Sequence, residues 1–598
     1  MAMRRTWTWH FDLPPERLWP VLADTNRFNE AMGLPTYELE ETPQPNGTVL
    51  RRGSGKAAGF TLEWEEKPYE WIHGRYFRQG RIFSKGPFKY FGPVFELEPE
   101  GEGSKVTYSL EWEALSLVGR VFGKRLARQA GDAIGKRILS AVAFINGERP
   151  TMFDLPPPVL PEGARERAAA FAQQVDRSPY GNGLGAPIAD FAMTGMASDL
   201  VHLKPKLLAK RLGVADRPAI EACLASVKAG LLTMKWDLLC TNCRGPKLTA
   251  LALSELPRGA HCESCNIDYD RDFERNVELS FAPVPTVRPL LAGGYCLSGP
   301  MSTPHVAVQM LLAPGERRTV TTDLAPGSYR LRALHPGRYT DIEHAGGAFP
   351  ALRLTDEGVE ALPANERGKI EFVNDATFEV AAVIENRSWA RDALTAPEVV
   401  TLQAFRDMFS EATLRPGDEA AVGQVALMFT DLRGSTALYE RIGDAAAYNL
   451  VRDHFAFLAT IVRDHDGAIV KTIGDAVMAS FGDPADAVRA ALAMQARIAG
   501  FNRERGDTPD RALAIKLGVH VGSSVMVNLN ERLDYFGSTV NMAARLQGQS
   551  EGGDIVLSRA VACDPAVRPL LEGVPMREES VMLKGFDQPV GFIRLLPG

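Results

Sequence analysis

The succession of hydrophobic patterns that starts at Val425 narrows the possible folds more than any other feature of the chain. A buried-strand pattern, VALMFTD, precedes a long helical stretch, two strand patterns around the turn TIGDAV, a second helical stretch and the strand pattern ALAIKLGVHVG. Apolar runs indicate buried strands, whereas apolar residues three and four apart indicate helices. The order β-α-β-β-α-β is typical of a split βαβ, ferredoxin-like unit with one open sheet face. Residues 425–598 are therefore predicted to form an α+β domain.

Charged and polar residues interrupt these patterns where strands and helices begin or end. Asp431 closes the first strand, and Lys471 and Asp475 lie four residues apart around the hairpin turn. Asn541 and Arg545 are one helical turn apart and project from one helix face. Each has an ordinary explanation, because aspartates cap helices and exposed Lys/Asp pairs are common and weak. Their joint occurrence in this order indicates a functional site instead.

The motifs FTDLRGST, KTIGDAVMASF, LGVHVG, LDYFGSTVNMAARL and LKGF stand in the order found in class III nucleotide cyclases. This part of the chain resembles the catalytic domain of that family. The resemblance implies a role for each matching residue: Asp431, Asp475 and the backbone carbonyl of Leu432 hold two divalent ions (Mg²⁺ or Mn²⁺), Lys471 and Asp534 read the purine, Asn541 and Arg545 stabilise the transition state, and Lys584 binds the polyphosphate.

Hydrogen-bonding chemistry favours ATP as the substrate of such a site. Adenine presents an amine donor, which the carboxylate of Asp534 can accept, and a ring-nitrogen acceptor, to which Lys471 can donate. Guanine reverses both groups and would leave buried polar groups unpaired. The expected reaction is the conversion of ATP to 3′,5′-cyclic AMP and pyrophosphate, and the alternative is a guanylate cyclase. The GG[DE]EF turn of diguanylate cyclases, a related family, is missing, since the hairpin reads TIGDAV.

The resemblance also implies a homodimer. In the family the site lies between two catalytic domains packed head to tail, one giving the metal-binding aspartates and the other the purine pair. The chain contains one such domain, so two-fold symmetry would give two complete sites per homodimer. Lys471 and Asp475 would then serve different sites, and a monomer should be inactive.

Four of the seven cysteines form two C-x2-C pairs, CTNC at Cys240 and Cys243 and CESC at Cys262 and Cys265. Two such pairs, 18 residues apart, supply four thiolates for a tetrahedral structural Zn²⁺. Four sulfur ligands leave no open position, so the predicted role is structural. The alternatives are four free cysteines or a redox pair, which would not need the second C-x2-C.

Residues 1–150 contain several strand patterns separated by Gly, Pro and Asn turns, followed by a long helical stretch. This order resembles the START-like (polyketide-cyclase/lipid-transport) helix-grip fold, in which a sheet wraps a helix around an apolar cavity. The resemblance implies a small apolar ligand. The alternative is that the six tryptophans of this region simply fill its core.

Further boundaries follow from composition along the chain. The predicted regions are a Pro-rich linker at 151–163, a helical, winged-helix-like region at 164–239, a zinc ribbon at 240–279, a β-rich sandwich at 280–395 and a linker at 396–424. The linker carries helical spacing over 396–413, which predicts either a signal-transmitting helix or a plain connector. With the N-terminal and cyclase-like regions, the predicted fold class is multidomain α+β.

Composition limits the possible partners. Hydrophobic residues make up 45% and charged residues 24% of the 598 residues, and the net charge is −7, without the basic excess of a nucleic-acid binder. No apolar stretch approaches the length of a membrane span or a signal peptide, which predicts a cytoplasmic protein. We therefore expect an adenylate cyclase regulated through its N-terminal region. A ligand-binding or lipid-transfer protein that uses the cyclase-like domain only to dimerise is the second hypothesis, and a zinc-ribbon nucleic-acid regulator the third.

Overall fold

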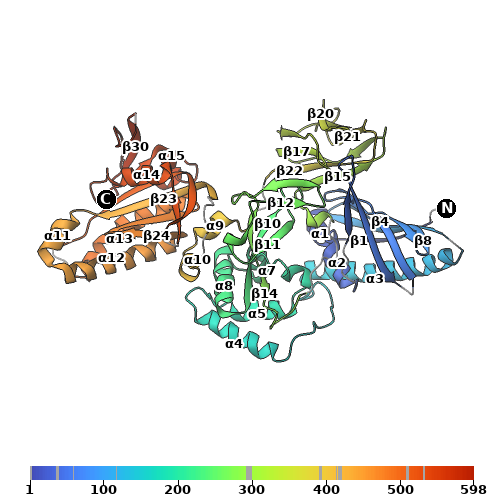
Figure 1. The fold of residues 1–598 in the computed structure, drawn as a ribbon, viewed down its shortest axis with the longest axis horizontal. Helices are drawn as coiled ribbons and strands as arrows, with labels where there is room; N and C mark the ends of the chain where they lie inside the picture. The colour runs from blue at the N-terminus through green and yellow to red at the C-terminus, as the bar shows by residue number, and fades with distance from the viewer. Residues whose placement is uncertain are drawn as a thin grey trace.

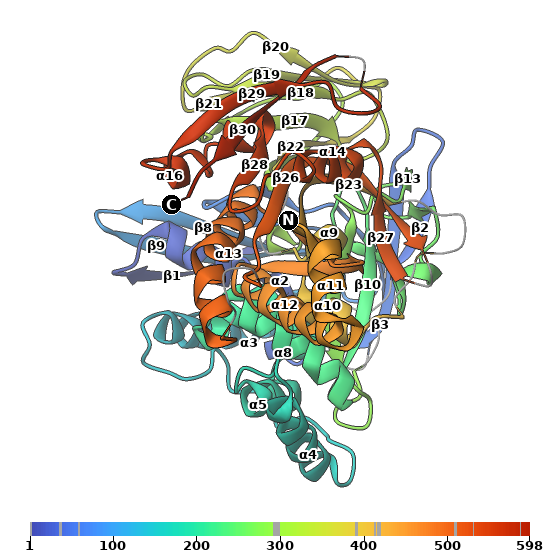
Figure 2. The ribbon, with the colours of Figure 1, turned by 90° about the vertical axis from the view of Figure 1, so that its left-hand side faces the viewer.

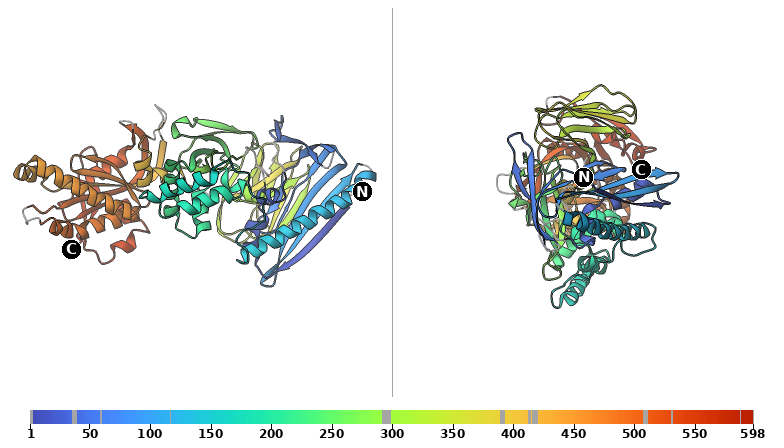
Figure 3. Two further views of the ribbon diagram at one scale, coloured as in Figure 1. Left: turned by 90° about the horizontal axis from the view of Figure 1, so that it is seen from below. Right: turned by 90° about the vertical axis from the view of Figure 1, so that its right-hand side faces the viewer.

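The computed structural model is elongated (Figure 1). The C-terminal domain lies at one end, the N-terminal sheet at the other, and the middle of the chain between them, as the view from below also shows (Figure 3). The structure describes residues 3–34, 39–57, 60–115, 117–290, 299–388, 393–411, 414, 420–506, 511–529, 532–586 and 588–597.

The N-terminal region is an antiparallel sheet with a long helix lying against it (Figure 3). Its elements are β1 (Met3–Phe11), α1 (Pro15–Leu22), α2 (Thr25–Ala31), β2 (Glu40–Pro43), β3 (Val49–Ala57), β4 (Phe60–Glu66), β5 (Glu70–Ile72), β6 (Tyr76–Arg78), β7 (Arg81–Lys85), β8 (Phe88–Glu100), β9 (Gly103–Ala114) and α3 (Leu117–Ile145). Helix α3 packs on β1 and β9, whose tryptophans face it. The strand-then-helix order follows the sequence pattern, while the START-like assignment stays a prediction.

Two glycines bring α3 into direct contact with these tryptophans. An added Cβ at Gly131 would lie 2.1 Å from the indole of Trp7, and one at Gly135 would lie 2.8 Å from the indole of Trp9. Both distances are far shorter than van der Waals contact, so the helix can sit this close only because these positions carry no side chain.

The β-rich region after residue 300 is joined to the N-terminal sheet. Its strands are β15 (Val306–Leu312), β16 (Arg317–Thr321), β17 (Gly327–Ala333), β18 (Thr340–His344), β19 (Ala351–Thr355), β20 (Gly358–Leu362), β21 (Lys369–Asn374) and β22 (Val380–Asn386). One sheet, β16-β21-β19-β20, packs across an apolar core on the strands β18-β17-β22-β15. Strand β15 pairs with β5 through Val308 and Gln309, so the second layer continues into the N-terminal sheet. The separate domain expected at 280–395 therefore shares its hydrogen-bonded sheet with residues 1–150.

The middle region combines five helices of the described chain with two small sheets. Its elements are α4 (Ala164–Arg177), α5 (Gly185–Thr194), α6 (Ala197–Leu200), α7 (Pro205–Leu212), α8 (Asp216–Ala229), β10 (Leu232–Leu239), β11 (Pro246–Ala250), β12 (Gly259–Cys262), β13 (Ile267–Asp270) and β14 (Val277–Pro283). Strand β10 lies between β11 and β14, and β12 pairs with β13. The predicted boundaries at 239/240 and 279/280 fall just after β10 and inside β14, so the helical and cysteine-bearing parts form one unit.

The linker differs from the single helix predicted over 396–413. It forms two short helices, α9 (Ala396–Val400) and α10 (Gln403–Met408), and residues 412 and 413 lie outside the described chain. The hydroxyl of Thr401 donates to the Glu398 carbonyl (2.8 Å), and Arg406 Nε donates to the Val400 carbonyl (2.7 Å). Side chains thus satisfy the last carbonyls of α9, which ends the helix where apolar spacing alone predicts continuation.

The C-terminal domain has a mixed sheet in the order β24-β25-β23-β26-β28-β30-β29, with β27 paired to β26. Its elements are β23 (Ala420–Leu432), α11 (Ser435–Ile442), α12 (Asp444–Asp464), β24 (Gly467–Ile473), β25 (Ala476–Phe481), α13 (Pro484–Glu504), β26 (Ile515–Leu529), β27 (Arg532–Phe536), α14 (Ser538–Gln547), β28 (Ile555–Ser558), α15 (Arg559–Ala562), α16 (Arg568–Leu571), β29 (Met576–Val581) and β30 (Val590–Leu595). Figure 2 views this domain from its own end of the molecule.

The two faces of this sheet pack on different partners. Ala426 and Met428 of β23 belong to a core with helices α12 and α13. The alternate residues, Leu427 and Phe429, belong to a core shared with the middle region and the linker helices. Because side chains alternate across a strand, β23 separates these two cores.

No helix of the described residues is both long enough and apolar enough to cross a membrane.

The glycine contacts of α3 can be tested with a matched pair of substitutions. We expect Gly131→Ala to destabilise the N-terminal region by about 1–3 kcal/mol, because the new methyl group overlaps the Trp7 ring. Gly500→Ala in α13 is the control, since its Cβ meets only the flexible end of Arg503, at 3.9 Å. It should stabilise by up to about 1 kcal/mol through helix propensity. Calorimetric melting of the full chain measures the stability of both variants. Equal changes in stability would contradict the close contact between Gly131 and Trp7.

Candidate functional site

Asp431 and Asp475 meet at one end of the C-terminal sheet. Asp431 is the second-last residue of β23, and Asp475 follows Gly474, whose φ of 64° allows the tight turn between β24 and β25. Burial and the nearby charge of Asp475 raise the pKa of Asp431. The Oδ2 atom of Asp475 is buried and has no hydrogen-bond partner among the described residues. Two mutually repelling carboxylates with an unsatisfied oxygen are chemically suited to hold divalent cations.

Sequence reasoning missed several neighbours of these carboxylates. Lys516 of β26 lies directly across from Asp431 in the strand pairing, and its charge favours the ionised carboxylate. Tyr439 of α11 has its pKa raised to about 12 by burial and by Asp475. His454 of α12 is fully buried, and burial lowers its pKa to about 4. Lys516 could have been predicted as a neighbour, because a lysine interrupts the apolar strand pattern ALAIKLG. Tyr439 and His454 could not, because they stand in ordinary helical patterns.

Lys471 and Asp534 form an ion pair of 2.5 Å between Nζ and Oδ2. They come from β24 and β27, which are not neighbours in the sheet, so the contact crosses the sheet rather than following a strand pair. The other carboxylate oxygen of Asp534 accepts the Tyr535 backbone N–H (2.8 Å). The Lys471 side chain is 36% exposed and that of Asp534 10% exposed, so a ligand can reach the pair from the lysine side.

Asn541 and Arg545 both lie exposed on α14, and Lys584 is exposed between β29 and β30. No hydrogen bond or ion pair within the described residues joins these three side chains to the four residues above. Two glycines of the LGVHVG motif fix the helix on β26: a Cβ at Gly518 would lie 2.2 Å from the Gln547 backbone, and one at Gly522 would lie 2.8 Å from Thr539. The backbone carbonyl of Leu432 belongs to the last residue of β23, next to Asp431.

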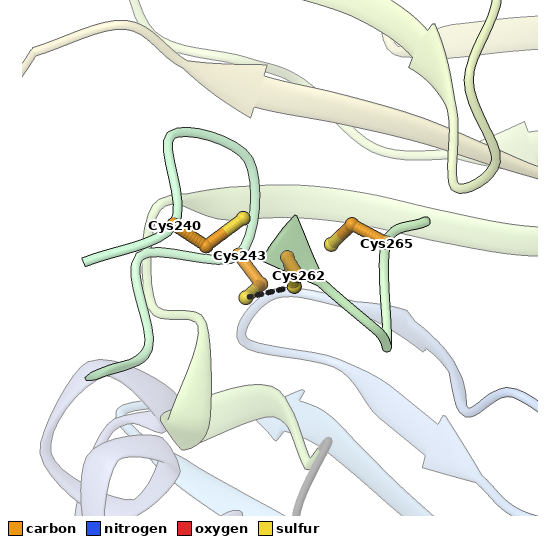
Figure 4. A group of neighbouring side chains, drawn as sticks. All are labelled: Cys240, Cys243, Cys262 and Cys265. Carbon is orange, nitrogen blue, oxygen red and sulfur yellow. Dashed lines mark hydrogen bonds between the residues drawn. The ribbon is translucent and has the colours of Figure 1, made fainter. Parts of the chain in front are cut away.

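The four predicted zinc ligands gather into one cluster (Figure 4). Their sulfur atoms all lie within 4.8 Å of one another, and Cys243 Sγ is 3.9 Å from Cys262 Sγ. A tetrahedral Zn²⁺ with bonds of about 2.3 Å needs sulfurs about 3.8 Å apart. Hydrogen bonds among the four thiols lower the pKa of Cys243 and of Cys262 and raise that of Cys240 and of Cys265. The cluster is therefore compatible with zinc.

Each cysteine pair ends in the same local turn. Arg244, directly after Cys243, has a φ of 54°, and Asn266, directly after Cys265, has a φ of 50°. The Arg244 guanidinium also donates to the carbonyls of Asn386 (2.9 Å) and Ser388 (2.8 Å), at the end of β22. Arg244 thus fixes the cluster to the β-rich region.

A cavity of 290 Å³ lies where the N-terminal sheet, the cysteine cluster and the β-rich region meet. Much of its lining is charged or polar, including Arg51, Glu65, Glu66, Lys67 and Glu379. It does not lie under α3, where the helix-grip resemblance would place an apolar cavity. The small apolar ligand of residues 1–150 stays a prediction.

Two family models match parts of the chain. Residues 418–565 match the family described as the adenylate and guanylate cyclase catalytic domain, and residues 175–294 match a family of unknown function (DUF5939). The second match spans the helices of the middle region and the cysteine cluster, which form one unit in the structure. The C-terminal part of the chain is a class III adenylate/guanylate cyclase catalytic domain, as the motifs predict.

Individual relatives match less than a third of the chain. Adenylate cyclases of Mycosarcoma maydis, Anabaena cylindrica and Rhizobium meliloti are 34%, 30% and 32% identical over 23%, 29% and 23% of this chain. The matches span 6%, 36% and 23% of those proteins' own lengths. The crystal structure of the adenylyl cyclase CyaB from P. aeruginosa is 26% identical, with a TM-score of 0.27, and the match covers 30% of this chain and 95% of that one.

Removal of one cysteine tests the cluster. We expect Cys240→Ser to lose bound zinc, measured by elemental analysis, and to lower the melting temperature of the full chain, because three thiolates cannot complete the tetrahedral site. Cys563→Ser is the matched control, since Cys563 is exposed and lies outside the cluster. Equal zinc content in the two variants would exclude a zinc site at these cysteines.

Proposed function

We propose that the protein is an adenylate cyclase that converts ATP to 3′,5′-cyclic AMP and pyrophosphate. The observation that carries this proposal is the pairing of Lys471 with Asp534 in the domain that also brings Asp431 and Asp475 together. The first pair offers one donor and one acceptor for a purine, and the second offers two carboxylates for cations. The adenylate cyclases among the relatives support the same assignment.

Asp431 and Asp475 are the residues that would hold Mg²⁺ or Mn²⁺, with the Leu432 carbonyl as a further oxygen ligand. Their repulsion and the unpartnered Asp475 Oδ2 fit this role. Bound there, the ions supply Lewis-acid activation of the ribose 3′-hydroxyl and neutralise the triphosphate. Lys516 and the Leu432 backbone N–H favour the ionised form of Asp431, so this carboxylate can act as a ligand despite its burial.

Adenine recognition requires the base to reach the ion pair of Lys471 and Asp534. The exocyclic amine of adenine then donates to Asp534, and Lys471 donates to a ring nitrogen. The two side chains compensate each other's charge when no base is bound, so neither is left buried and unpaired. GTP would set donor against donor and acceptor against acceptor at the same two groups, and its turnover should be lower.

Arg545 and Asn541 would act on the reacting phosphate and the ribose, and Lys584 on the outer phosphates. Negative charge builds on the α-phosphoryl oxygens during in-line attack, and the planar guanidinium can donate to them. All three side chains are exposed on one chain, as expected for groups that complete a site only at an interface. We propose that this interface is a homodimer.

Apolar side chains beside the purine pair support such an interface. Ile473 at the end of β24 is 50% exposed, Phe536 at the end of β27 is 65% exposed, and Leu529 at the end of β26 is 45% exposed. Large exposed apolar groups around a polar site are typical of surfaces that another protein covers. Zinc at the cysteine cluster and regulation through residues 1–150 are further parts of the proposal.

Asp475→Asn tests the metal half of the site. It preserves the side-chain shape but removes one charged ligand, so we expect cyclisation of ATP in Mn²⁺ to fall by at least about a hundredfold. Added Mn²⁺ should raise the melting temperature of the wild type but not that of the variant. Without metal, the variant should melt no lower than wild type, because a like-charge repulsion is removed.

Asp464→Asn, an exposed aspartate of α12 that lies 3.7 Å from Arg497, is the control and should behave as wild type. The assay is run with ATP and with GTP in parallel. Wild-type turnover of neither nucleotide would refute the proposed function, and faster turnover of GTP would make the protein a guanylate cyclase.

Shared sites can be tested by mixing two inactive chains. Lys471→Ala damages the purine half and Asp431→Ala the metal half, so each homodimer should be silent. In a mixed dimer one site carries both lesions and the other none. Random pairing makes half of the dimers mixed, each with one working site of two, so activity should recover to about a quarter of wild type.

Mixing Lys471→Ala with Asp534→Ala is the matched control for this experiment. Both lesions lie in the purine half, so each site of a mixed dimer is damaged and activity should stay absent. If the mixture of Lys471→Ala and Asp431→Ala stays inactive although tagged copies verify heterodimers, each chain builds its site alone.

A further inference from the structure

Helix α10 lies between the C-terminal domain and the middle region (Figure 1) and contacts both β24 and α8. Its first residue, Gln403, accepts a hydrogen bond from the backbone N–H of Ile469, with 2.7 Å between Gln403 Oε1 and Ile469 N. The pairing of β24 with β25 shifts register between Ile469 and Lys471, which marks a bulge at Val470. Bulges redirect the side chains that follow them. Gln403 thus binds the main chain at the bulge that sets the orientation of the Lys471 side chain.

Arg406, on the same helix, holds the second purine-reading strand. Its Nη1 donates to the Leu533 carbonyl at 3.1 Å, and its guanidinium carbon lies 5.6 Å from the centre of the Tyr535 ring. These two residues flank Asp534 on β27. The same guanidinium donates through Nε to the Val400 carbonyl, so the arginine ties β27 to the end of α9.

The other side of α10 belongs to the middle region. Phe405 meets Trp236 of β10 edge to face, with ring centres 6.2 Å apart and an interplanar angle of 88°. The Tyr180 hydroxyl donates to the carboxylate of Asp407. Lys228 of α8 places its ammonium 4.6 Å from the centre of the Phe409 ring. One short helix is therefore fixed to the middle region on one side and to both purine-reading strands on the other.

We propose that α10 sets the positions of Lys471 and Asp534, and that the middle region acts on nucleotide recognition through this helix. Gln403 and Arg406 are positioning residues, since they contact the main chain beside the purine pair rather than the nucleotide. The inference rests on the proposed cyclase function for its kinetic consequences. The contacts themselves do not depend on it.

The alternative is that α10 is a connector whose contacts only contribute to stability. The two alternatives differ in what the enzyme loses. A connector would change the amount of folded protein and leave the affinity of the folded enzyme for ATP unchanged. A positioning helix would change the Michaelis constant and the choice between ATP and GTP, because Lys471 and Asp534 supply the purine contacts.

Kinetics of full-length variants separate these alternatives. We expect Arg406→Ala to raise KM for ATP about tenfold, equivalent to about 1.4 kcal/mol, with kcat changed less than about twofold. The preference for ATP over GTP should fall at the same time. Gln403→Ala should act in the same direction, and Arg406→Lys should be intermediate because an ammonium can replace one of the two hydrogen bonds.

Tyr180→Phe tests the link to the middle region. It removes only the hydroxyl that donates to Asp407. Tyr180 belongs to the middle region and lies far in sequence from both Lys471 and Asp534, and its substitution should also raise KM for ATP. Arg489→Ala is the matched control. Arg489 lies on α13, is 45% exposed and pairs with Asp486 on the opposite face of the sheet, so its loss should leave both constants unchanged.

Hydrogen exchange without nucleotide gives a readout independent of catalysis. In Gln403→Ala and Arg406→Ala, amides in 467–473 and 532–536 should exchange faster than in wild type and in Arg489→Ala. If wild type makes no cyclic nucleotide but exchange rises as expected, the proposed function fails and the positioning role of α10 stands. If exchange, KM and the ATP/GTP preference all match the Arg489→Ala control, the inference is overturned.

Discussion

A single apolar core joins one face of the C-terminal sheet to the middle region, and the arrangement of the candidate site depends on this core. Leu427 and Phe429 of β23 and Tyr535 of β27 share this core with Trp236 and Phe405. Burial on this scale dominates the free energy of association between elements. Strands β24 and β27, which carry Lys471 and Asp534, are therefore fixed by the packing of the middle region as well as by the hydrogen bonds of their own sheet.

The contacts of Asp431 and Asp475 lie within the C-terminal domain. Asp431 stands next to Leu432, which ends β23 and packs in the core with α12 and α13, and Asp475 lies in the turn between β24 and β25. No contact described for these two carboxylates involves the middle region. The two halves thus differ in what supports them, since one belongs wholly to the catalytic domain and the other is held jointly with α10. A change in the middle region would reach the purine half first.

The C-terminal cyclase domain could be predicted from the sequence because its candidate site residues stand where apolar runs stop. The proximity of Asp431 and Asp475 could be predicted in this way, and the spacing of the cysteine pairs predicted their cluster. The pairing of β5 with β15 could not be predicted, since a strand of three residues is too short for its pattern to identify its partner. The break between α9 and α10 was also hidden, because it depends on the Thr401 hydroxyl and on Arg406, four residues into the next helix.

The burial of α10 decides how a change in the middle region can reach the site. Phe405 is 1% exposed and Trp236 is 1% exposed, so neither ring can move without opening the core around it. Close-packed interiors transmit displacement rather than absorb it. Strand β10, which carries Trp236, runs directly into Cys240 of the cysteine cluster. A shift of this strand would therefore move α10 as a body, and Gln403 and Arg406 would carry the same displacement to both sides of the purine pair.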